Sequence, residues 1–212
     1  MGRDKMRDWL FIDRYYQELT QDIYDQPNDS GHSLMAKEII NKWFPDLDGN
    51  SVLDVGCGTG FCSEFVENNK KDYLGIEKGI SSKTPFIIDM DFNFLSKFKA
   101  DTFDIVLSRH TLEHSPFPLL TLMEWHRVAK MYLLLVLPNP EYYTFIGKNH
   151  YSVMDKQQSR WLLRRAGWEV LKTDYSEPTE LRFLCRKRER IGAEGYISKL
   201  TNNIYEADRD GK

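Results

Sequence analysis

The sequence predicts an α/β fold in which helices cover both faces of a mostly parallel sheet. Short segments rich in Val, Ile and Leu alternate with longer segments of helical periodicity along most of the chain. A glycine-rich turn also separates an early apolar strand from a helix, as in nucleotide-binding βαβ units. Because parallel strands need crossover helices, this alternation predicts a three-layer α/β/α sandwich.

The composition of the chain is that of a single globular domain with 212 residues, of which 41% are hydrophobic and 29% charged. The net charge of −3 argues against a broadly basic nucleic-acid surface. No apolar run approaches the roughly 20 residues that a membrane helix needs, and we expect no signal peptide. The three cysteines form no disulfide framework, so we expect reduced thiols and a cytoplasmic location.

The first 48 residues are expected to form a helical cap on the core. Apolar residues recur at intervals of three and four up to residue 26, which is typical of an amphipathic helix. A second helix is predicted over residues 33–43. We therefore divide the chain into an N-terminal cap (1–48), a core (49–190) and a C-terminal helical tail (191–212).

A glycine-rich turn follows the first predicted core strand, residues 52–55, and precedes a helix predicted over residues 61–69. Three glycines stand at alternate positions in this turn: Gly56, Gly58 and Gly60. Glycine reaches positive φ without steric cost and lets a ligand approach the backbone closely. The spacing differs from the dinucleotide pattern G-x-G-x-x-G, and the absence of a following Gly-Lys-Ser/Thr excludes a P-loop. An NAD-type site is the weaker alternative.

Acidic residues close the next two predicted strands. The second strand, residues 73–76, ends in Glu77, which is placed to accept hydrogen bonds from ribose hydroxyls. The third strand, residues 85–91, carries Asp89 directly after its apolar run. The carboxyl ends of parallel strands form the edge at which α/β sheets bind ligands, so both acids are candidate ligand contacts.

The rest of the chain continues the alternation of strands and helices. Asp155 is placed to cap one of these helices and Gly167 to end it. The helix over residues 116–130 is expected to turn Leu119, Leu122, Met123, His126 and Val128 inward. The predicted strands are 102–108, 132–137, 168–173 and 181–186, and the predicted helices are 116–130, 156–165 and 196–205.

Two of these segments resemble the first two motifs of the class I S-adenosylmethionine-dependent methyltransferases. They are Asp54 to Gly60, which reads D-V-G-C-G-T-G, and Leu74 to Glu77, which reads L-G-I-E. The phrases F-D-I-V at residues 103–106 and L-E-H at residues 112–114 match this family as well. The resemblance covers about residues 33–187. It implies S-adenosyl-L-methionine as cofactor and a Rossmann-like sheet of seven strands in the order 3-2-1-4-5-7-6, with the seventh antiparallel.

The resemblance also implies which residues bind the cofactor. An acid after the third strand meets the adenine amino group, and we prefer Asp89 to Asp91 because it directly closes the apolar run. The next backbone N–H, that of Met90, would meet the ring. The residues expected at the cofactor are Asp54, Gly56, Cys57, Gly58, Thr59, Gly60, Glu77, Asp89, Met90, Ser108 and Arg109.

A zinc-protease pattern lies in the same region. Residues 110–114 read H-T-L-E-H, which fits H-x-x-E-H. That zinc motif needs a sustained helix, whereas this segment follows a strand and is cut short by Pro116. We therefore expect no metal ligands here, and we expect His114 to hold the loop by hydrogen bonds.

Residues 141–155 form the loop most typical of a substrate site, because aromatic and titratable side chains follow the fifth strand there. The expected substrate contacts are Tyr142, Tyr143 and Tyr151. The phrase N-H-Y at residues 149–151 is similar to one that family members carry in this place. We prefer His150 as the polar group on the substrate side. The candidate catalytic residues, which the sequence does not rank as general base, are His150, His110 and Glu113.

The exit of the fifth strand, residues 138–143, partly matches the Asn/Asp-Pro-Pro-Tyr motif of amino-methyltransferases that act on extruded bases. Glu141 stands in place of the second proline, and the segment follows the fifth strand instead of the fourth. We therefore favour a proline-stiffened turn over a nucleic-acid methyltransferase.

The function predicted from these residues is direct transfer of a sulfonium methyl group to an oxygen or nitrogen atom of a small-molecule acceptor. The protein mainly aligns the nucleophile in such a reaction, and a hydroxyl acceptor gains from a general base. A non-catalytic protein that holds S-adenosylmethionine or S-adenosylhomocysteine, alone or with a partner chain, is the alternative. The sequence indicates neither the acceptor nor the oligomeric state.

Overall fold

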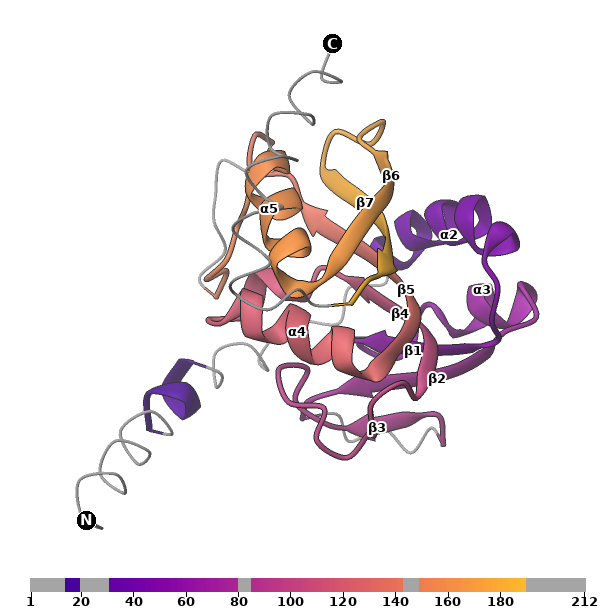
Figure 1. Ribbon diagram of the computed structural model, residues 1–212, viewed down its shortest axis with the longest axis horizontal. Coiled ribbons are helices and arrows are strands. Elements are labelled where there is room, and N and C mark those ends of the chain that lie inside the picture. Colours follow the sequence, from indigo (N-terminus) through magenta and orange to yellow (C-terminus); the bar gives the residue numbers. More distant parts are fainter. Residues whose placement is uncertain (1–13, 20–30, 80–84, 143–148, 190–212) are drawn as a thin grey trace.

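The computed structural model describes residues 14–19, 31–79, 85–142 and 149–189. Seven strands form one sheet in the order β3-β2-β1-β4-β5-β7-β6, as Figure 1 shows. Strand β7 is antiparallel to both of its neighbours, and all other pairs are parallel. The predicted fold class and strand order are therefore confirmed. The strands are β1 (Ser51–Val55), β2 (Asp72–Glu77), β3 (Ile87–Asp89), β4 (Phe103–Arg109), β5 (Ala129–Pro138), β6 (Trp168–Asp174) and β7 (Glu180–Lys187).

Helices cover both faces of this sheet. Helices α2 (Gly31–Trp43) and α3 (Ser63–Asn68) lie on one side, and α4 (Pro118–Val128) and α5 (Lys156–Ala166) on the other (Figure 1). Two 3₁₀ turns, η1 (Phe44–Asp46) and η2 (Leu112–His114), lie in the connections. Of the amphipathic helix expected near the N-terminus, residues 14–19 are helical, and the rest lies outside the described residues, as does the expected C-terminal helix.

Alternating side chains of the central strands supply two separate cores. In β1, Val52 belongs to the core under α2 and α3, whereas Leu53 and Val55 belong to the core under α4 and α5. The β4 residues Ile105 and Val106 divide in the same way. Because successive strand residues point to opposite faces, a sheet covered on both sides needs apolar residues at nearly every position.

Local sequence signals place both ends of α5. The Asp155 side chain accepts the Gln158 N–H at 2.7 Å in a capping box, and Gly167 ends α5 with φ of +99°. Helix α4 is shorter than predicted. Its Trp125 is fully buried, although it was not among the residues expected to turn inward. The Trp125 indole N–H donates to the Phe92 carbonyl at 2.8 Å. Helix α3 has only six residues, two of which, Phe65 and Val66, are buried.

No helix among the described residues is both long and apolar enough to span a bilayer. The longest described helix, α2, has 13 residues, and it packs Ile39, Ile40 and Trp43 into the core beside β1. These three side chains are thus directed to the sheet.

Candidate active site

The turn after β1 has the backbone that its glycines predict. Gly56, Gly58 and Gly60 take φ values of +73°, +57° and +87°, a region that other residues rarely adopt. At Gly56 an added Cβ would lie 2.1 Å from Oγ1 of Thr111, so the turn is pressed against the loop after β4. At Gly58 the nearest atom to an added Cβ belongs to the Phe61 ring, 3.5 Å away. The space beside Gly58 is therefore open to a ligand.

Glu77 connects the end of β2 to this turn. Its Oε2 accepts the Gly58 N–H at 2.7 Å, and its Oε1 accepts the Lys78 N–H at 3.1 Å. Burial raises the pKa of Glu77, and the two backbone donors oppose that rise. A carboxylate beside an open glycine turn fits the place that a ribose takes in nucleotide-binding α/β folds. The residues present therefore fit a nucleoside-containing cofactor.

Asp54 lies underneath the turn and is 2% exposed. Its Oδ2 accepts the hydroxyl of Tyr73 at 2.8 Å. Burial raises the pKa of Asp54 to about 7, although hydrogen bonds from Tyr73 and Cys62 act in the opposite direction. The sequence suggested Asp54 as a cofactor contact, and the structure gives it partners inside the protein.

The acids after β3 have different surroundings. Asp89 is exposed; its Oδ1 accepts the Gly79 N–H at 3.2 Å and lies 3.7 Å from the Lys78 ammonium. Asp91 accepts the Tyr16 hydroxyl and, at 2.8 Å, the Asn93 N–H. The N–H of Met90, expected to meet the adenine ring, donates to the Glu77 carbonyl at 3.2 Å. The hydrogen bond between Tyr16 of the N-terminal segment and Asp91 was not predicted from the sequence.

The remaining expected cofactor contacts lie around the same edge of the sheet. Cys57 is buried, and its backbone N–H and that of Gly56 both donate to the Ile76 carbonyl at 3.0 Å. Thr59 is exposed at the tip of the turn. Ser108, near the end of β4, is fully buried, and its hydroxyl has no hydrogen-bond partner among the described residues.

A buried ion cluster joins the end of β4 to the start of β7. Oε1 of Glu180 accepts Nη2 of Arg109 at 2.9 Å, and Oε2 accepts Nε of Arg182 at 2.8 Å. Burial alone would raise the pKa of Glu180, but the hydrogen bond from His110 and the charge of Arg109 lower it to about 2. Glu180 and Arg182 were not predicted from the sequence as site residues. Their charges in the otherwise apolar strand segment E-L-R-F-L-C could have indicated them, because buried charged residues need partners.

His110 belongs to the same cluster. It has φ of +49°, which is uncommon for a non-glycine residue, and its Nε2 lies 3.2 Å from Oε1 of Glu180. Because Glu180 is ionised and only accepts hydrogen bonds, Nε2 carries the proton. In the neutral imidazole the lone pair is then on Nδ1, which lies 3.6 Å from Oε1 of Glu113.

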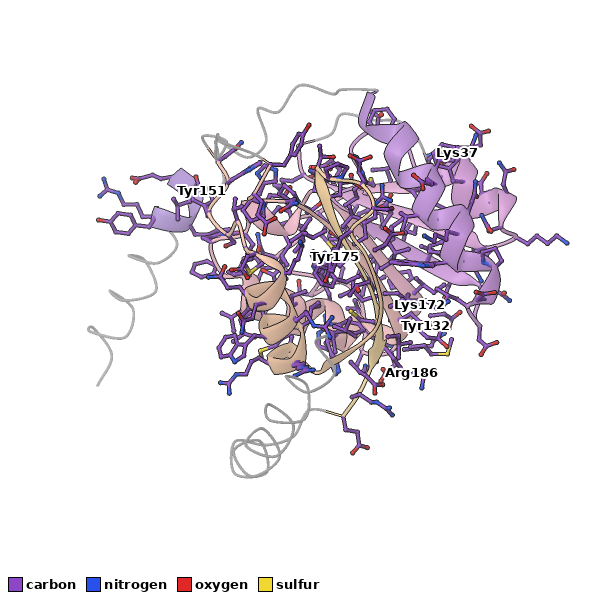
Figure 2. All side chains as sticks on the ribbon, turned by 90° about the horizontal axis from the view of Figure 1, so that it is seen from above. Lys37, Tyr132, Tyr151, Lys172, Tyr175 and Arg186 are labelled. Atoms are coloured by element: carbon purple, nitrogen blue, oxygen red, sulfur yellow. The ribbon has the colours of Figure 1, made fainter. Side chains whose placement is uncertain are left out.

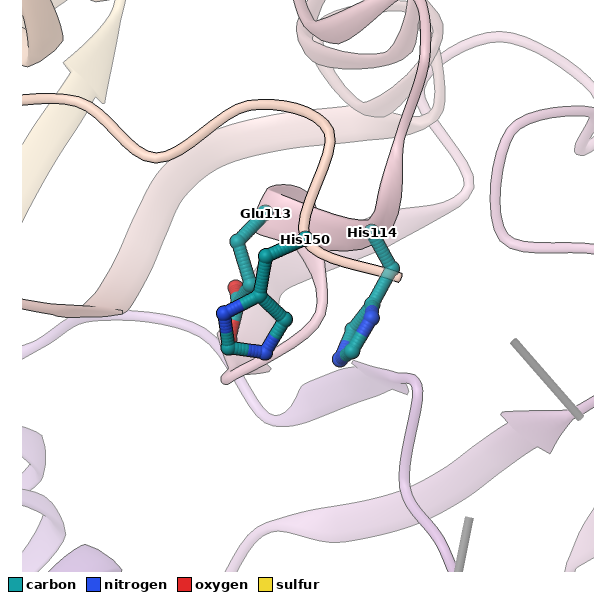
Figure 3. Close-up of side chains that lie close together, drawn as sticks. All are labelled: Glu113, His114 and His150. Carbon is teal, nitrogen blue, oxygen red and sulfur yellow. The ribbon is translucent and has the colours of Figure 1, made fainter. Parts of the chain in front are cut away.

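The structure brings Glu113 and His150 together with His114. Figure 3 shows Glu113 and His114 on the η2 turn and His150 on the neighbouring loop after β5. The rings of His114 and His150 meet edge to face, with centroids 4.7 Å apart. Burial raises the pKa of Glu113 to about 8 and, with a contribution from His150, lowers that of His114 to about 4. His114 Nδ1 also lies 3.1 Å from the Asn149 carbonyl, consistent with the predicted loop contact.

The expected substrate tyrosines occupy different places. Tyr142 is 60% exposed, and Tyr143 lies outside the described residues. The Tyr151 hydroxyl donates to the Leu19 carbonyl at 3.0 Å, so Tyr151 lies beside the N-terminal helical turn (Figure 2). Tyr151 therefore links the loop after β5 to the N-terminal segment.

Comparison with known proteins assigns the family. Residues 31–173 match the family described as a methyltransferase domain. This match covers more than half of the chain, so the chain belongs to that family. Its fold is that of the class I S-adenosylmethionine-dependent methyltransferases, whose cofactor is S-adenosyl-L-methionine.

Individual relatives are distant. Phosphoethanolamine N-methyltransferase 3 of Arabidopsis thaliana is 25% identical over 181 residues, which cover 74% of this chain and 37% of the relative. A ubiquinone biosynthesis O-methyltransferase of Hahella chejuensis is 29% identical over 118 residues, which cover 47% of this chain and 48% of the relative. A methyltransferase structure from Aquifex aeolicus matches with a TM-score of 0.60 and 19% identity, covering 81% and 97% of the two chains. The chain thus spans less than half of these curated relatives.

Gly56 and Gly58 differ in the room each leaves for a Cβ, so valine substitutions at the two positions form a matched test of cofactor binding by the turn. Gly58→Val is strained by its φ of +57°, but its Cβ overlaps no neighbouring atom, so the fold should persist with some loss of stability, whereas binding of S-adenosylhomocysteine should be abolished because the side chain fills the open side of the turn. Gly56→Val is expected to destabilise the fold itself by overlap with Thr111. Circular dichroism and calorimetry separate the two effects. Normal binding by Gly58→Val would mean that the turn does not contact the cofactor.

The raised pKa of Asp54 predicts a pH-dependent stability. A carboxyl group with a folded pKa of about 7 stabilises the fold fully below pH 4, and that contribution falls as the pH rises through 7. Asp54→Asn, which cannot ionise, should gain stability relative to the wild type between pH 5 and 8, by at most about 1.4 kcal/mol per pH unit. Thermal melts of both proteins across this range test it. Parallel pH profiles would show that Asp54 is not protonated in the fold.

Proposed function

We propose that the protein transfers the methyl group of S-adenosyl-L-methionine to an oxygen or nitrogen atom of a small-molecule acceptor. The observation that carries this proposal is the Glu77 carboxylate hydrogen-bonded to the open, positive-φ turn at Gly58. When bound, the cofactor supplies a sulfonium methyl; on transfer to a hydroxyl, the S–C bond breaks, an O–C bond forms and a proton is released. Family membership supports the same reaction class.

The acceptor is proposed to bind at the ends of β4 and β5. The candidate cofactor contacts Gly58, Glu77 and Asp89 follow β1, β2 and β3, whereas His110 follows β4 and His150 follows β5. An acceptor bound beside His110 and His150 would lie at the same edge of the sheet as a cofactor bound beside Gly58, Glu77 and Asp89. The aromatic residues proposed to help hold it are Tyr142, Tyr143 and Tyr151. The two named relatives methylate nitrogen and oxygen, respectively, which supports a small-molecule acceptor of either kind.

His110 is the side chain best arranged to act as general base toward a hydroxyl acceptor. Its Nε2–H is held by Glu180, which orients the ring and leaves the lone pair on Nδ1. Its side chain is 18% exposed, whereas that of Glu113 is 1% exposed. Glu113 and His150 are the other proposed catalytic groups: Glu113 lies 3.6 Å from His110, and His150 lies with Glu113 and His114. An amine acceptor would need only desolvation and alignment by these groups.

Removing the Glu77 carboxylate is expected to weaken cofactor binding. In Glu77→Ala, loss of hydrogen bonds to a charged acceptor should weaken S-adenosylhomocysteine binding by about 10- to 150-fold. Glu64→Gln, on the exposed side of α3, is the control and should bind as the wild type does. Titration calorimetry measures all three. No binding by the wild type would overturn the cofactor assignment, and full affinity in Glu77→Ala would remove only its ribose role.

The acceptor is found by a turnover screen. Formation of S-adenosylhomocysteine is followed with purified protein over panels of phenols, sugars, lipids, amines and tRNA. Turnover with a small molecule supports the proposal. Turnover restricted to tRNA would overturn the acceptor class. Cofactor binding with no turnover on any panel would favour the non-catalytic alternative.

Loss of the His110 imidazole is expected to affect turnover more than cofactor binding. With a hydroxyl acceptor, His110→Ala should lower kcat by about 10²–10⁴-fold. The affinity for S-adenosylhomocysteine should stay near that of the wild type, because the ring contacts Glu180 and Glu113 instead of the glycine turn. An unchanged kcat would exclude His110 as the base. A rise in KM alone would assign it to acceptor binding.

A further inference from the structure

We infer that Glu113, His114 and His150 form a binding site for one divalent metal ion of the zinc type. One ligand atom of each side chain, a carboxylate oxygen or an imidazole nitrogen, lies within 4.8 Å of the others (Figure 3). Bonds of about 2.0–2.2 Å hold the ligands of such an ion roughly 3–3.5 Å apart, so modest side-chain rotations close the set. Two imidazoles and one carboxylate are a donor set that suits Zn²⁺ and related divalent ions.

The Glu113 carboxylate is the strongest sign of a missing partner. The residue is 1% exposed, and neither oxygen has a hydrogen-bond donor from another described residue. The imidazole of His110 is nearby at 3.6 Å, but this separation is too long for a hydrogen bond. Leaving a buried carboxylate without donors is costly, and a cation bound to it removes that cost. A positive ligand bound at these oxygens would supply the partner that the described residues do not.

The two histidines are prepared for such a role in different ways. Nδ1 of His114 donates to the Asn149 carbonyl at 3.1 Å, because a carbonyl only accepts. Its Nε2 therefore carries the lone pair. Metal-binding histidines commonly donate their second ring nitrogen to a carbonyl in this way, which fixes the ring and its tautomer. His150 lies next to this ring, on the loop after β5 that also carries Asn149, and is half-buried.

The two segments that carry the ligands are tied together. Ser152 donates its backbone N–H to the Glu113 carbonyl at 2.9 Å, and its hydroxyl donates to the carbonyl of Ser115. These bonds hold the loop after β5 against the η2 turn, so the two segments that carry the ligands are fixed relative to each other. With three protein ligands, at least one position on the ion stays open to water or to an oxygen atom of another molecule.

This site differs from the zinc-protease pattern that the sequence contains. That pattern would use His110 and His114 on one helix. In the structure these residues lie on a strand end and a three-residue 3₁₀ turn, and the His110 ring faces Glu180. His150, 36 positions beyond His114 in the sequence, completes the set instead. The expectation of no metal ligands rested on the His110–His114 pair alone.

Zinc titration of metal-free protein tests the inference. The wild type, stripped with a chelator, is titrated with Zn²⁺ against a chromophoric competitor, and melting is followed with and without Zn²⁺. One equivalent should bind and raise the melting temperature. Glu113→Gln and His150→Ala should each weaken binding by at least about 10–100-fold. His110→Ala is the matched control and should retain wild-type affinity.

Two further measurements keep the result unambiguous. Circular dichroism and S-adenosylhomocysteine binding confirm that each variant is folded, and the absorption spectrum with Co²⁺ reports whether thiolates from the three cysteines are ligands. Absence of uptake by the wild type would overturn the inference, as would a thiolate spectrum or full affinity in His150→Ala. Loss of binding in His110→Ala with retention in His150→Ala would assign the ion to the H-x-x-E-H pair and would also overturn it.

Discussion

The close contact between Gly56 and Thr111 determines how the two halves of the site are placed. The Thr111 hydroxyl donates to the Val55 carbonyl at 3.1 Å, and its side chain fills the space where any Cβ on Gly56 would lie. The glycine turn after β1 and the turn after β4 are thereby packed together. Because these turns carry Gly58 on one side and His110 on the other, the contact sets the separation between the candidate cofactor turn and the candidate catalytic side chain.

Three buried carboxyl groups at this edge have different electrostatic environments. Asp54 receives hydrogen bonds from neutral groups, which do not overcome burial, so its pKa rises to about 7. Glu180 has two arginines and a histidine as partners, so its pKa falls to about 2. Glu113 is buried without such partners, and its pKa rises to about 8. At neutral pH, Glu180 is the fixed negative charge that organises the cluster, and Glu113 is the group whose charge depends on what binds beside it.

The two halves of the site use different chemistry, which explains why the fold does not determine the acceptor. The candidate cofactor half consists of the backbone of a glycine turn and the carboxylate of Glu77, which lies 19 positions after Gly58 in the sequence. The proposed acceptor half depends on side chains that follow β4 and β5 and on Glu180 at the start of β7, which are far from the glycine turn in the sequence. The two relatives, named a phosphoethanolamine N-methyltransferase and a ubiquinone biosynthesis O-methyltransferase, both match this chain and differ in the acceptor atom that their names give.

The sequence by itself determined the elements that local physics controls. Strands β1 to β7 were predicted from apolar runs, α5 from its Asp155 cap and Gly167 end, and the role of the glycine turn from its need for positive φ. The order of the strands came from family resemblance, since no local signal encodes it. Only the tertiary structure brought together groups far apart in the chain, such as Arg109 with Glu180, 71 positions away, and Glu113 with His150. These contacts exist because β7 pairs with β5, which lies beside β4, and this pairing is a property of the whole sheet.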